Sequence, residues 1–406
     1  MDVTARLAAL VACGALVAVC VPVPGAAPAP PLRVKIVSSF PLQGPGRTQT
    51  VPIVNAIKMA LEEQGGKAGN TIVEYESHDD ASAARQAWDA EVEAENARRA
   101  AADPSVVAYI ATFNSPAARI SVPITCQAGL LMISPANTYP GLTQSFEKDE
   151  PGKYYPGCAR NFARVIPTDG VQGTVAARWA KELGAKKVYI VHDAELYGTV
   201  LAEAFRAEAK RLGLEEAGYD AAPKALDFRA LANKVVSSGA DLVYHGGNGS
   251  NDPGFVLRDL KRANPSIRFM GPDGIRTPQL LRQAGGDAVG TYLTSEVIPV
   301  ASYTGRAKEW AGRYRARYGE SPGDYSIYGY DAAKVVLAAI AKAGQRSNDR
   351  AAIRELVMGT KDFDGILGRW SFDEHGDTSL RTTGGWKFTK LGNDFESSIE
   401  FQKELN

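Results

Sequence analysis

Segments typical of β-strands alternate with segments typical of α-helices along most of this chain. The first strand-like segments are "LRVKIVSSF" (32–40), "TIVEYES" (71–77), "SVVAYIA" (105–111) and "GLLMIS" (129–134), and stretches with helical periodicity separate them. Repeated strand–helix units predict a mainly parallel sheet with helices on both faces. The fold class that this pattern predicts is therefore α/β.

The pattern starts again after residue 166 and gives a second full set of strands and helices up to residue 299. Because 406 residues are too many for one comfortable hydrophobic core, two domains are expected. Further helices follow within 305–359, and the C-terminal segments "GRWSFD" (368–373) and "GGWKFTK" (384–390) are again strand-like. In the first half we expect one long amphipathic helix over 81–102, ended by Asp103-Pro104.

An apolar run with one positive charge at its front, "RLAALVACGALVAVCVPV" (6–23), precedes the first strand. Such a run, followed by small residues and prolines, is typical of a secretory signal or an N-terminal anchor, so residues 1–31 are set apart from the folded chain. An uncleaved membrane helix is the alternative, at the short limit for a span. "LVAC", ending at Cys13, resembles a lipoprotein processing site, so a lipid anchor is a further alternative. We expect an extracytoplasmic protein, in the periplasm or on the outer face of the cytoplasmic membrane.

Four cysteines are present, and Cys13 and Cys20 lie in the leader. In an exported chain the other two, Cys126 and Cys158, favour one disulfide, with two free buried thiols as the alternative. Cys158 lies near the end of a Pro/Gly/Tyr-rich stretch, 135–162, that shows no clear periodicity. Stretches of this length inside a domain are usually functional or constrained, and the disulfide would tie this one to the preceding helix.

Charge and motif content exclude several classes of function. Lys plus Arg and Asp plus Glu both total 46, whereas nucleic-acid binders usually carry a basic excess or stripe. The four histidines form no pair with metal-ligand spacing, and no CxxC motif, nucleophile elbow or phosphate-binding loop occurs. We therefore expect no catalytic residues, no metal site, no cofactor and no nucleic-acid partner, and a role other than that of an enzyme.

Polar side chains cluster where the expected strands end. In open α/β sheets, ligands bind beyond the carboxyl ends of the strands. The residues in question are Thr112, Phe113, Asn114 and Ser115, then Ser134, Ala136, Asn137 and Thr138, then Tyr197, Gly246, Gly247, Asn248 and Asp273. The first two groups offer hydroxyls and backbone amides at helix N-termini, which suit an anion, whereas Asp273 suits a cation. Together they predict a site for a zwitterion.

Each of these residues also has a purely structural interpretation. Ser115 and Asp273 are both residue types that cap helix N-termini. Tyr197 could form part of a wall with its hydroxyl in water, and Thr138 precedes the turn-forming sequence Tyr-Pro-Gly. The residues together point to a ligand more strongly than any one alone, because all lie at the same end of their strands.

Five segments resemble the leucine/isoleucine/valine-binding proteins of ABC transporters, which have the type I periplasmic-binding fold. They are "GLLMISPANTYPGLT" (129–143), "VYIVHDAELYG" (188–198), "DLVYHGGN" (241–248), "IRFMGPDG" (267–274) and "YGYDAAKVVLAAI" (328–340), and they occur in the family's order. The resemblance covers nearly all of residues 32–406. It implies two doubly wound α/β lobes, joined by three hinge crossings, that trap a ligand when they close.

We expect the crossings near Ile166, Pro299 and Thr382. The N-terminal lobe then comprises residues 32–166 and 300–381. The C-terminal lobe comprises residues 167–299 and 382–406.

The resemblance also implies a role for each site residue. Ser115, Ala136 and Thr138 lie where the family binds the ligand's carboxylate, with Phe113, Asn114 and Asn137 beside them. Tyr197 matches a tyrosine that covers the ligand, and Tyr325 lies near an aromatic residue of the side-chain pocket. Asp273 takes the place of the acid, usually glutamate, that pairs with the ligand's amino group. Asn248 stands where a tyrosine is common, and the 139–161 loop is longer than usual. The resemblance therefore does not define the side chain of the ligand.

The function that the resemblance implies is that of a solute-binding protein of an ABC transporter. Such a protein captures a small amino acid, branched-chain or related, in the interlobe cleft and delivers it to a membrane permease. We expect it to act as a monomer. The alternative is a ligand-sensing receptor domain of the same fold that partners a membrane signalling protein.

Overall fold

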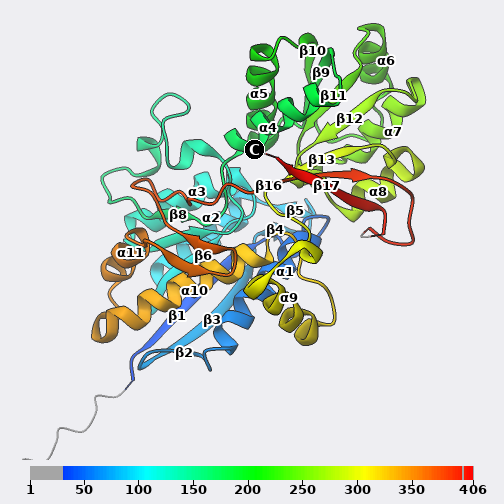
Figure 1. The fold of residues 1–406 in the computed structure, drawn as a ribbon. Coiled ribbons are helices and arrows are strands. Elements are labelled where there is room, and N and C mark those ends of the chain that lie inside the picture. Colours follow the sequence, from blue (N-terminus) through cyan, green and yellow to red (C-terminus); the bar gives the residue numbers. More distant parts are fainter. Residues whose placement is uncertain (1–30, 396, 406) are drawn as a thin grey trace, which may run out of the picture. The chain divides into compact units, whose positions relative to one another are not determined.

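The computed structural model describes residues 31–395 and 397–405 (Figure 1). The expected leader, with Cys13 and Cys20, lies outside the described residues except for Pro31. Among the described helices, none combines the length and apolar character that a membrane span requires.

The first sheet has the strand order β2-β3-β1-β6-β7-β8. Its strands are β1 (Arg33–Phe40), β2 (Lys67–Ala68), β3 (Thr71–Asp79), β6 (Val106–Ala111), β7 (Leu131–Ser134) and β8 (Phe162–Arg164). Every neighbouring pair is parallel except the short β2–β3 pair. Without β2, the chain order across the sheet is 2-1-3-4-5, a doubly wound arrangement.

Helices cover both faces of this sheet. The first face packs against α1 (Arg47–Glu62), α9 (Gly305–Tyr318), α10 (Ser326–Ala343) and α11 (Arg350–Met358). The other face packs against α2 (Ala90–Ala102) and α3 (Ser115–Gln127). The alternation of β1 explains this division, because Val34 and Ile36 point into the first core and Val37 into the second.

The second sheet has the strand order β10-β9-β11-β12-β13-β16-β17. Its strands are β9 (Lys187–His192), β10 (Glu215–Ala221), β11 (Leu242–Gly246), β12 (Arg268–Gly271), β13 (Tyr292–Ser295), β16 (Thr383–Phe388) and β17 (Ile399–Leu405). The first five strands are parallel and repeat the 2-1-3-4-5 order. The antiparallel β16 and β17, red in Figure 1, extend the sheet beside β13.

The helices of the second lobe again divide between two faces. One face packs against α4 (Asp169–Glu182) and α5 (Leu196–Arg211), and the other against α6 (Arg229–Ser237), α7 (Pro253–Ala263) and α8 (Pro278–Ala284). The predicted fold class, two doubly wound α/β lobes, is confirmed.

The chain passes between the two lobes three times. It leaves the first sheet after β8 and enters the second core with α4. After β13 it returns, since Trp310 of α9 and Trp370 of β15 (Gly368–Trp370) belong to the first core, and β16 then rejoins the second sheet. We keep the lobe boundaries 32–166 with 300–381, and 167–299 with 382–406, as a proposal.

The prediction of one helix over 81–102 is wrong for the first part of this range. The segment starts with a small antiparallel ladder of β4 (Ala81–Ser82) and β5 (Ala87–Trp88), and α2 begins only at Ala90. Asp89 is its N-cap, because the carboxylate accepts hydrogen bonds from the backbone N–H of Glu91 (3.0 Å) and Val92 (3.4 Å). The helix therefore starts at this cap, although the amphipathic pattern begins further upstream.

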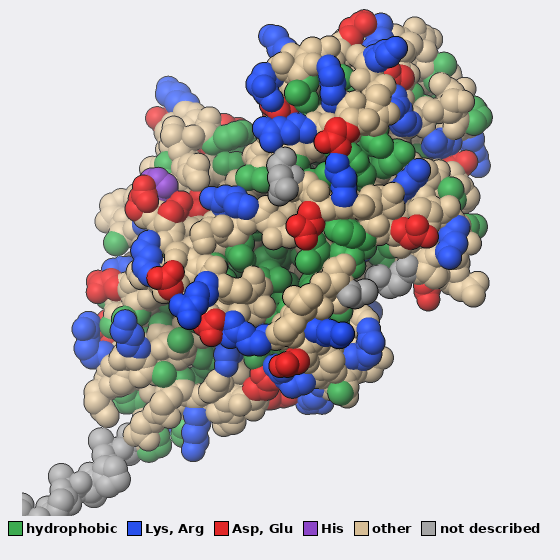
Figure 2. All heavy atoms as spheres, viewed as in Figure 1, with side chains coloured by type: hydrophobic (Ala, Val, Ile, Leu, Met, Phe, Trp, Pro, Cys, Tyr) green, Lys and Arg blue, Asp and Glu red, His purple; other side chains and the backbone are tan. Residues whose placement is uncertain are grey.

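Acidic and basic side chains are interspersed on the face drawn in Figure 2, and neither sign forms a continuous patch there. Large exposed hydrophobic side chains among the described residues come from separate segments: Phe146, Leu226, Val289 and Leu391. The surface in this view therefore offers no single-sign field, and its hydrophobic side chains gather mainly in the middle of the view.

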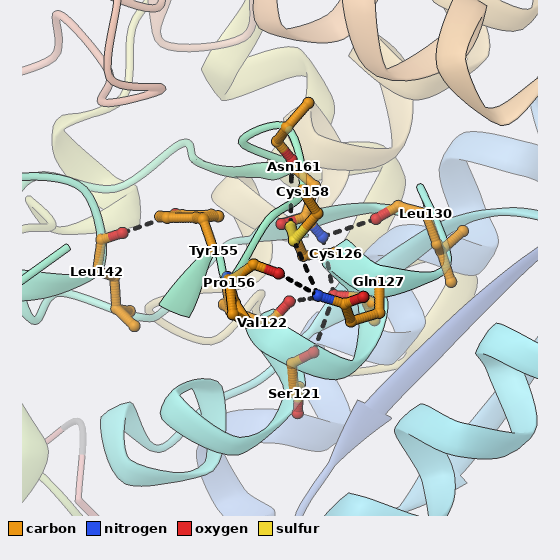
Figure 3. The surroundings of a disulfide bond; sticks show 12 residues. Ser121, Val122, Cys126, Gln127, Leu130, Leu142, Tyr155, Pro156, Cys158 and Asn161 are labelled. Carbon is orange, nitrogen blue, oxygen red and sulfur yellow. Dashed lines mark hydrogen bonds between the residues drawn. A yellow bond between two sulfur atoms is a disulfide. The ribbon is translucent and has the colours of Figure 1, made fainter. Parts of the chain in front are cut away.

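Cys126 and Cys158 form a disulfide with their Cα atoms 5.9 Å apart, which confirms the expected pairing. Figure 3 shows how Cys126, in the last turn of α3, meets Cys158 near the end of the 135–162 stretch. Beside it, the Gln127 side-chain amide donates to the backbone oxygen of Pro156 (2.5 Å), and Tyr155 donates to that of Leu142 (2.7 Å). The long stretch is thus fastened to α3 and to itself.

Replacing both Cys126 and Cys158 by serine should lower the free energy of unfolding by about 3–4 kcal/mol, because the disulfide restricts the unfolded chain. Urea denaturation monitored by circular dichroism measures the change. A reducing agent should destabilise the wild type by a similar amount and leave the double variant unchanged. Equal stability of oxidised wild type and double variant would contradict this account.

Candidate ligand-binding site

The carboxyl ends of parallel strands from both lobes meet at one small pocket. It is lined by Phe113, Asn114, Ser115, Ala136, Tyr197, Asn248, Asp273, Gly274 and Tyr325. Four of these residues follow β6 and β7 of the first sheet, and another four come from the second lobe; Tyr325 directly precedes α10. The structure thus brings together all the residues expected to bind a ligand except Asn137 and Thr138.

Asn137 and Thr138 lie buried behind the pocket lining. The Asn137 side chain accepts a hydrogen bond from the backbone N–H of Thr112 and donates to the backbone oxygen of Phe113, both at 3.1 Å. It therefore joins the loops that follow β6 and β7. The Thr138 hydroxyl is buried without a hydrogen-bond partner among the described residues.

A buried ion pair holds the loop after β7 in place. The guanidinium of Arg164, fully buried, donates to the backbone oxygens of Asn137 (3.1 Å) and Tyr139 (2.7 Å). Its Nε donates to the Asp377 carboxylate at 2.7 Å. A buried charge needs such a partner and several hydrogen bonds, so this loop has little freedom to move.

Ser115 is the first residue of α3 and has a side chain only 2% exposed. The capping interpretation does not hold, because Asn114 occupies the N-cap position and its side chain caps nothing. In the described part of the chain the Ser115 hydroxyl has no hydrogen-bond partner, and the residue lines the pocket. A free hydroxyl at the start of a helix suits an anion. The amides of the first turn contribute little, because Pro116 has no N–H and the N–H groups of Ala117 and Ala118 donate to the backbone oxygen of Asn114 (3.1 and 3.3 Å).

Asp273 follows β12 and is 2% exposed. Its Oδ1 accepts hydrogen bonds from the Tyr197 hydroxyl (2.9 Å) and the Gln172 amide (2.5 Å), and its Oδ2 accepts one from Tyr325. Tyr197 and Gln172 belong to the second lobe, whereas Tyr325 reaches the carboxylate from the helices that pack on the first sheet. Both lobes therefore contribute donors to a single buried carboxylate.

The capping interpretation of Asp273 also fails. The N-cap of α8 is Thr277, whose side chain accepts from the backbone N–H of Leu280 at 3.4 Å. Asp273 instead opens a single 3-10 turn, Asp273–Ile275, and turns its carboxylate toward the tyrosines. Its position is thus explained by contacts across the pocket and not by the helix that follows.

Two further carboxyl groups lie buried near Asp273: Asp169 at the start of α4 and Glu296 directly after β13. Burial is the main cause that raises the pKa of all three acids, and the charge of Asp273 adds to it for the other two. The pKa of Asp169 rises to about 7. The Thr138 hydroxyl partly offsets this rise without forming a hydrogen bond of normal geometry.

Asn248 is largely occupied by its own lobe. Its Oδ1 accepts from the backbone N–H of Ser250 at 2.9 Å, and its Nδ2 lies 3.4 Å from the carboxylate of Asp193. Phe113 and Tyr325 meet edge to face, with ring centroids 5.3 Å apart. Asn248 therefore adds a fixed amide to the pocket, whereas the two rings supply its apolar wall.

The enclosed space of this pocket is about 20 Å³, which is room for roughly one water molecule. A larger cavity of about 350 Å³ lies beside the second and third crossings. Apolar side chains such as Val297, Ile298 and Leu367 line it together with polar ones, among them Glu296 and Arg306. We place the candidate site at the smaller pocket, because the carboxyl ends of strands from both sheets meet there and donors from both lobes converge on the buried Asp273 carboxylate. An amino acid enters it only if the two walls separate.

A family model described as periplasmic binding protein matches residues 33–391. The chain belongs to the periplasmic binding protein family. An amino acid binding protein of Pseudomonas aeruginosa is 30% identical over 70% of this chain and 72% of its own. Leu/Ile/Val-binding protein homolog 3 of Brucella melitensis is 30% identical over 64% of this chain and 67% of its own.

Among solved structures, the leucine-binding protein LivK of Thermotoga maritima has a TM-score of 0.77 at 27% identity, and the match covers 92% of this chain and 99% of that one. The resemblance inferred from the sequence and the type I periplasmic-binding fold are thereby confirmed.

Sequence reasoning missed three side chains of this periplasmic binding protein that lie next to the pocket. Asp169 and Gln172 open α4 within "TDGVQG", where a helix start looked ordinary. Glu296 follows "YLTS" of β13, so the strand-end argument that singled out Asp273 applied to it as well. The rule that polar residues after a strand end mark the site could therefore have identified Glu296 from the sequence.

The raised pKa of Asp169 makes stability depend on pH. A buried acid whose pKa is higher in the folded protein than in the unfolded chain costs stability as the pH rises from about 4 through 7. Asp169→Asn should therefore be more stable than the wild type at pH 8, on the order of 2–4 kcal/mol, and show little difference below pH 4. Urea unfolding across this range measures it, and parallel pH profiles of the two proteins would contradict it.

Proposed function

We propose that this protein is an extracytoplasmic solute-binding protein of an ABC transporter that binds a small amino acid, branched-chain or related, and delivers it to a membrane permease. The observation that carries the proposal is the pocket itself: the free Ser115 hydroxyl at the start of α3 and the buried Asp273 carboxylate belong to one small space. Opposite charge preferences at the two ends of a pocket match a zwitterion. The names of the amino acid binding relatives support the same ligand class.

The roles divide along the pocket. Ser115 and the backbone at Ala136 hold the ligand's carboxylate, with Asn114 beside them. Asp273 pairs with the ammonium group, and Tyr197 covers it from the second lobe. Phe113 and Tyr325 contact the ligand's side chain, while Asn248 limits its size. Asn137 and Thr138 support this wall from behind.

Delivery also requires export, a membrane partner and an opening cleft. The leader at residues 1–31 supplies export, as a cleaved signal or a lipid anchor. The walls of the pocket belong to two lobes, so hinge opening along the three crossings admits the ligand and closure traps it. The protein works as a monomer that docks on the permease, with no cofactor and no catalytic step.

A thermal-denaturation screen of the purified protein against the twenty amino acids tests this function. A ligand that binds only the folded protein raises the midpoint by mass action, so one aliphatic amino acid or a small group of them should give saturable shifts. Calorimetry then confirms the affinity. If no amino acid shifts the midpoint and aromatic or simple carboxylic acids do, the amino acid assignment is wrong.

Replacing Asp273 by asparagine keeps the shape of the side chain and removes its charge. The affinity for the amino acid should fall by about 2–5 kcal/mol, or roughly 30-fold to several thousand-fold, because a desolvated ammonium group loses its counter-ion. Isothermal calorimetry measures the loss. Binding within about threefold of wild type would exclude the counter-ion role.

Thr277→Ala is the matched control for this variant. It lies four residues along the same segment and removes the cap of α8, which should cost about 1 kcal/mol of stability. Its affinity for the amino acid should stay unchanged. A comparable loss of affinity in Thr277→Ala would mean that the segment, and not the Asp273 charge, supports binding.

A further inference from the structure

Glu296 has no role in the site described so far, yet its side chain is 2% exposed. Its backbone oxygen accepts a hydrogen bond from Tyr328 at 2.6 Å, which fixes the residue just after β13. The Gln172 amide that donates to the Asp273 carboxylate also donates to the backbone oxygen of Thr294 (3.2 Å), two residues before Glu296. Tyr325, one helical turn before Tyr328, donates to the same carboxylate. The two acids are therefore neighbours, and each acts on the pKa of the other. No donor of the described residues reaches either oxygen of the Glu296 side chain.

Two ionised carboxylates this close in a buried site repel each other. Both oxygens of Glu296 would in addition remain as buried acceptors without donors, which costs free energy for each. A single proton between the two acids removes both penalties, since the protonated acid then donates to the other. The geometry thus requires a proton on one member of the pair.

The hydrogen bonds decide which acid carries that proton. Asp273 accepts from Gln172, Tyr197 and Tyr325, and donors to a carboxylate stabilise its charged form. Glu296 accepts from none of the described residues. Asp273 is therefore the ionised member, and Glu296 is the protonated one.

We propose that Glu296 is a positioning residue whose protonated carboxyl donates a hydrogen bond to Asp273 and keeps the pair at one negative charge. The functional part of this inference rests on the proposed function. A pair of acids with one negative charge matches a ligand that places a single ammonium group beside Asp273. A ligand with two adjacent cationic nitrogens would leave one of them uncompensated in a buried site.

Among the groups that surround the pair, Asp169 can add a negative charge at neutral pH, because its pKa lies at about 7. The groups that face the pair are Asp169 of α4, Tyr197 of α5, Tyr244 of β11, and Tyr325 and Tyr328 at the start of α10. Burial raises the pKa of Tyr197, Tyr244 and Tyr328 well above the usual range, so these three stay neutral. Among the described residues no lysine, arginine or histidine donates to either carboxyl, although Arg164 acts on Asp169 through its charge.

The proton should remain when the ligand binds. Burial is the largest cause of the raised pKa of Glu296, and the charge of Asp273 comes second. An ammonium group on Asp273 offsets only the second cause, whereas closure around a ligand preserves the first. Binding at neutral pH is therefore expected to release no proton from Glu296.

Infrared difference spectroscopy tests the protonation without any ligand. The wild type at pH 7 should show a carbonyl band of a protonated carboxylic acid that is lost in Glu296→Gln and kept in Asp169→Asn. Absence of a band specific to Glu296 would overturn the proposal, because the side chain would then be ionised.

Titration calorimetry with L-leucine tests the positioning role. Glu296→Gln retains an N–H donor in the same place and should bind within about threefold of wild type, whereas Glu296→Leu should bind about tenfold to a hundredfold more weakly. Titrations in two buffers of different ionisation enthalpy should show no proton release. Weak binding by Glu296→Gln, or one proton released by the wild type only, would refute the role. If the Glu296 band is present and neither L-leucine nor any other amino acid binds, the proposed function fails while the protonation stands.

Discussion

Burial of the Asp273 carboxylate is the constraint on which the arrangement of this site depends. An ionised carboxyl group out of water is tolerated only with several donors around it. These donors come from α4, from α5 and from the segment before α10, so the carboxylate connects parts of both lobes. The backbone takes part as well: a Cβ added at Gly274 would lie 2.7 Å from Cε1 of Tyr197, so only glycine lets that ring approach.

Much of the fold follows from local pattern. The start of α3 at Ser115 and the strands β6 and β9 could be read from short apolar runs between helical stretches. The start of α2 could not, because a single cap at Asp89 and the β4–β5 ladder override a continuous amphipathic pattern. β17 was also missed, since the pairing that makes it a strand is with β16 and only tertiary structure brings the two together.

The site was predictable to the extent that parallel strands end on one side of a sheet. That rule selected Phe113, Ser115, Tyr197 and Asp273, which line one pocket. It could not show that Asn137 turns its side chain toward Thr112, or that three acids from distant segments share one buried region. Those facts depend on how two lobes pack, and sequence spacing carries no information on the distance between Asp169, Asp273 and Glu296.

The position of these acids makes the free energy of their ionisation depend on how the two lobes are arranged. Asp169 stands just after the first passage between the lobes and Glu296 just after β13, where the second passage begins. Opening the lobes would hydrate both carboxyls and lower the free energy of their charged forms, whereas closing them favours the protonated forms. A ligand with one positive charge would offset the free-energy cost of burying the ionised Asp273. It would favour the closed arrangement by the difference between its affinities for the closed and the open forms. The segments at which we propose the lobes to bend therefore carry the acids that would respond to a bound cation.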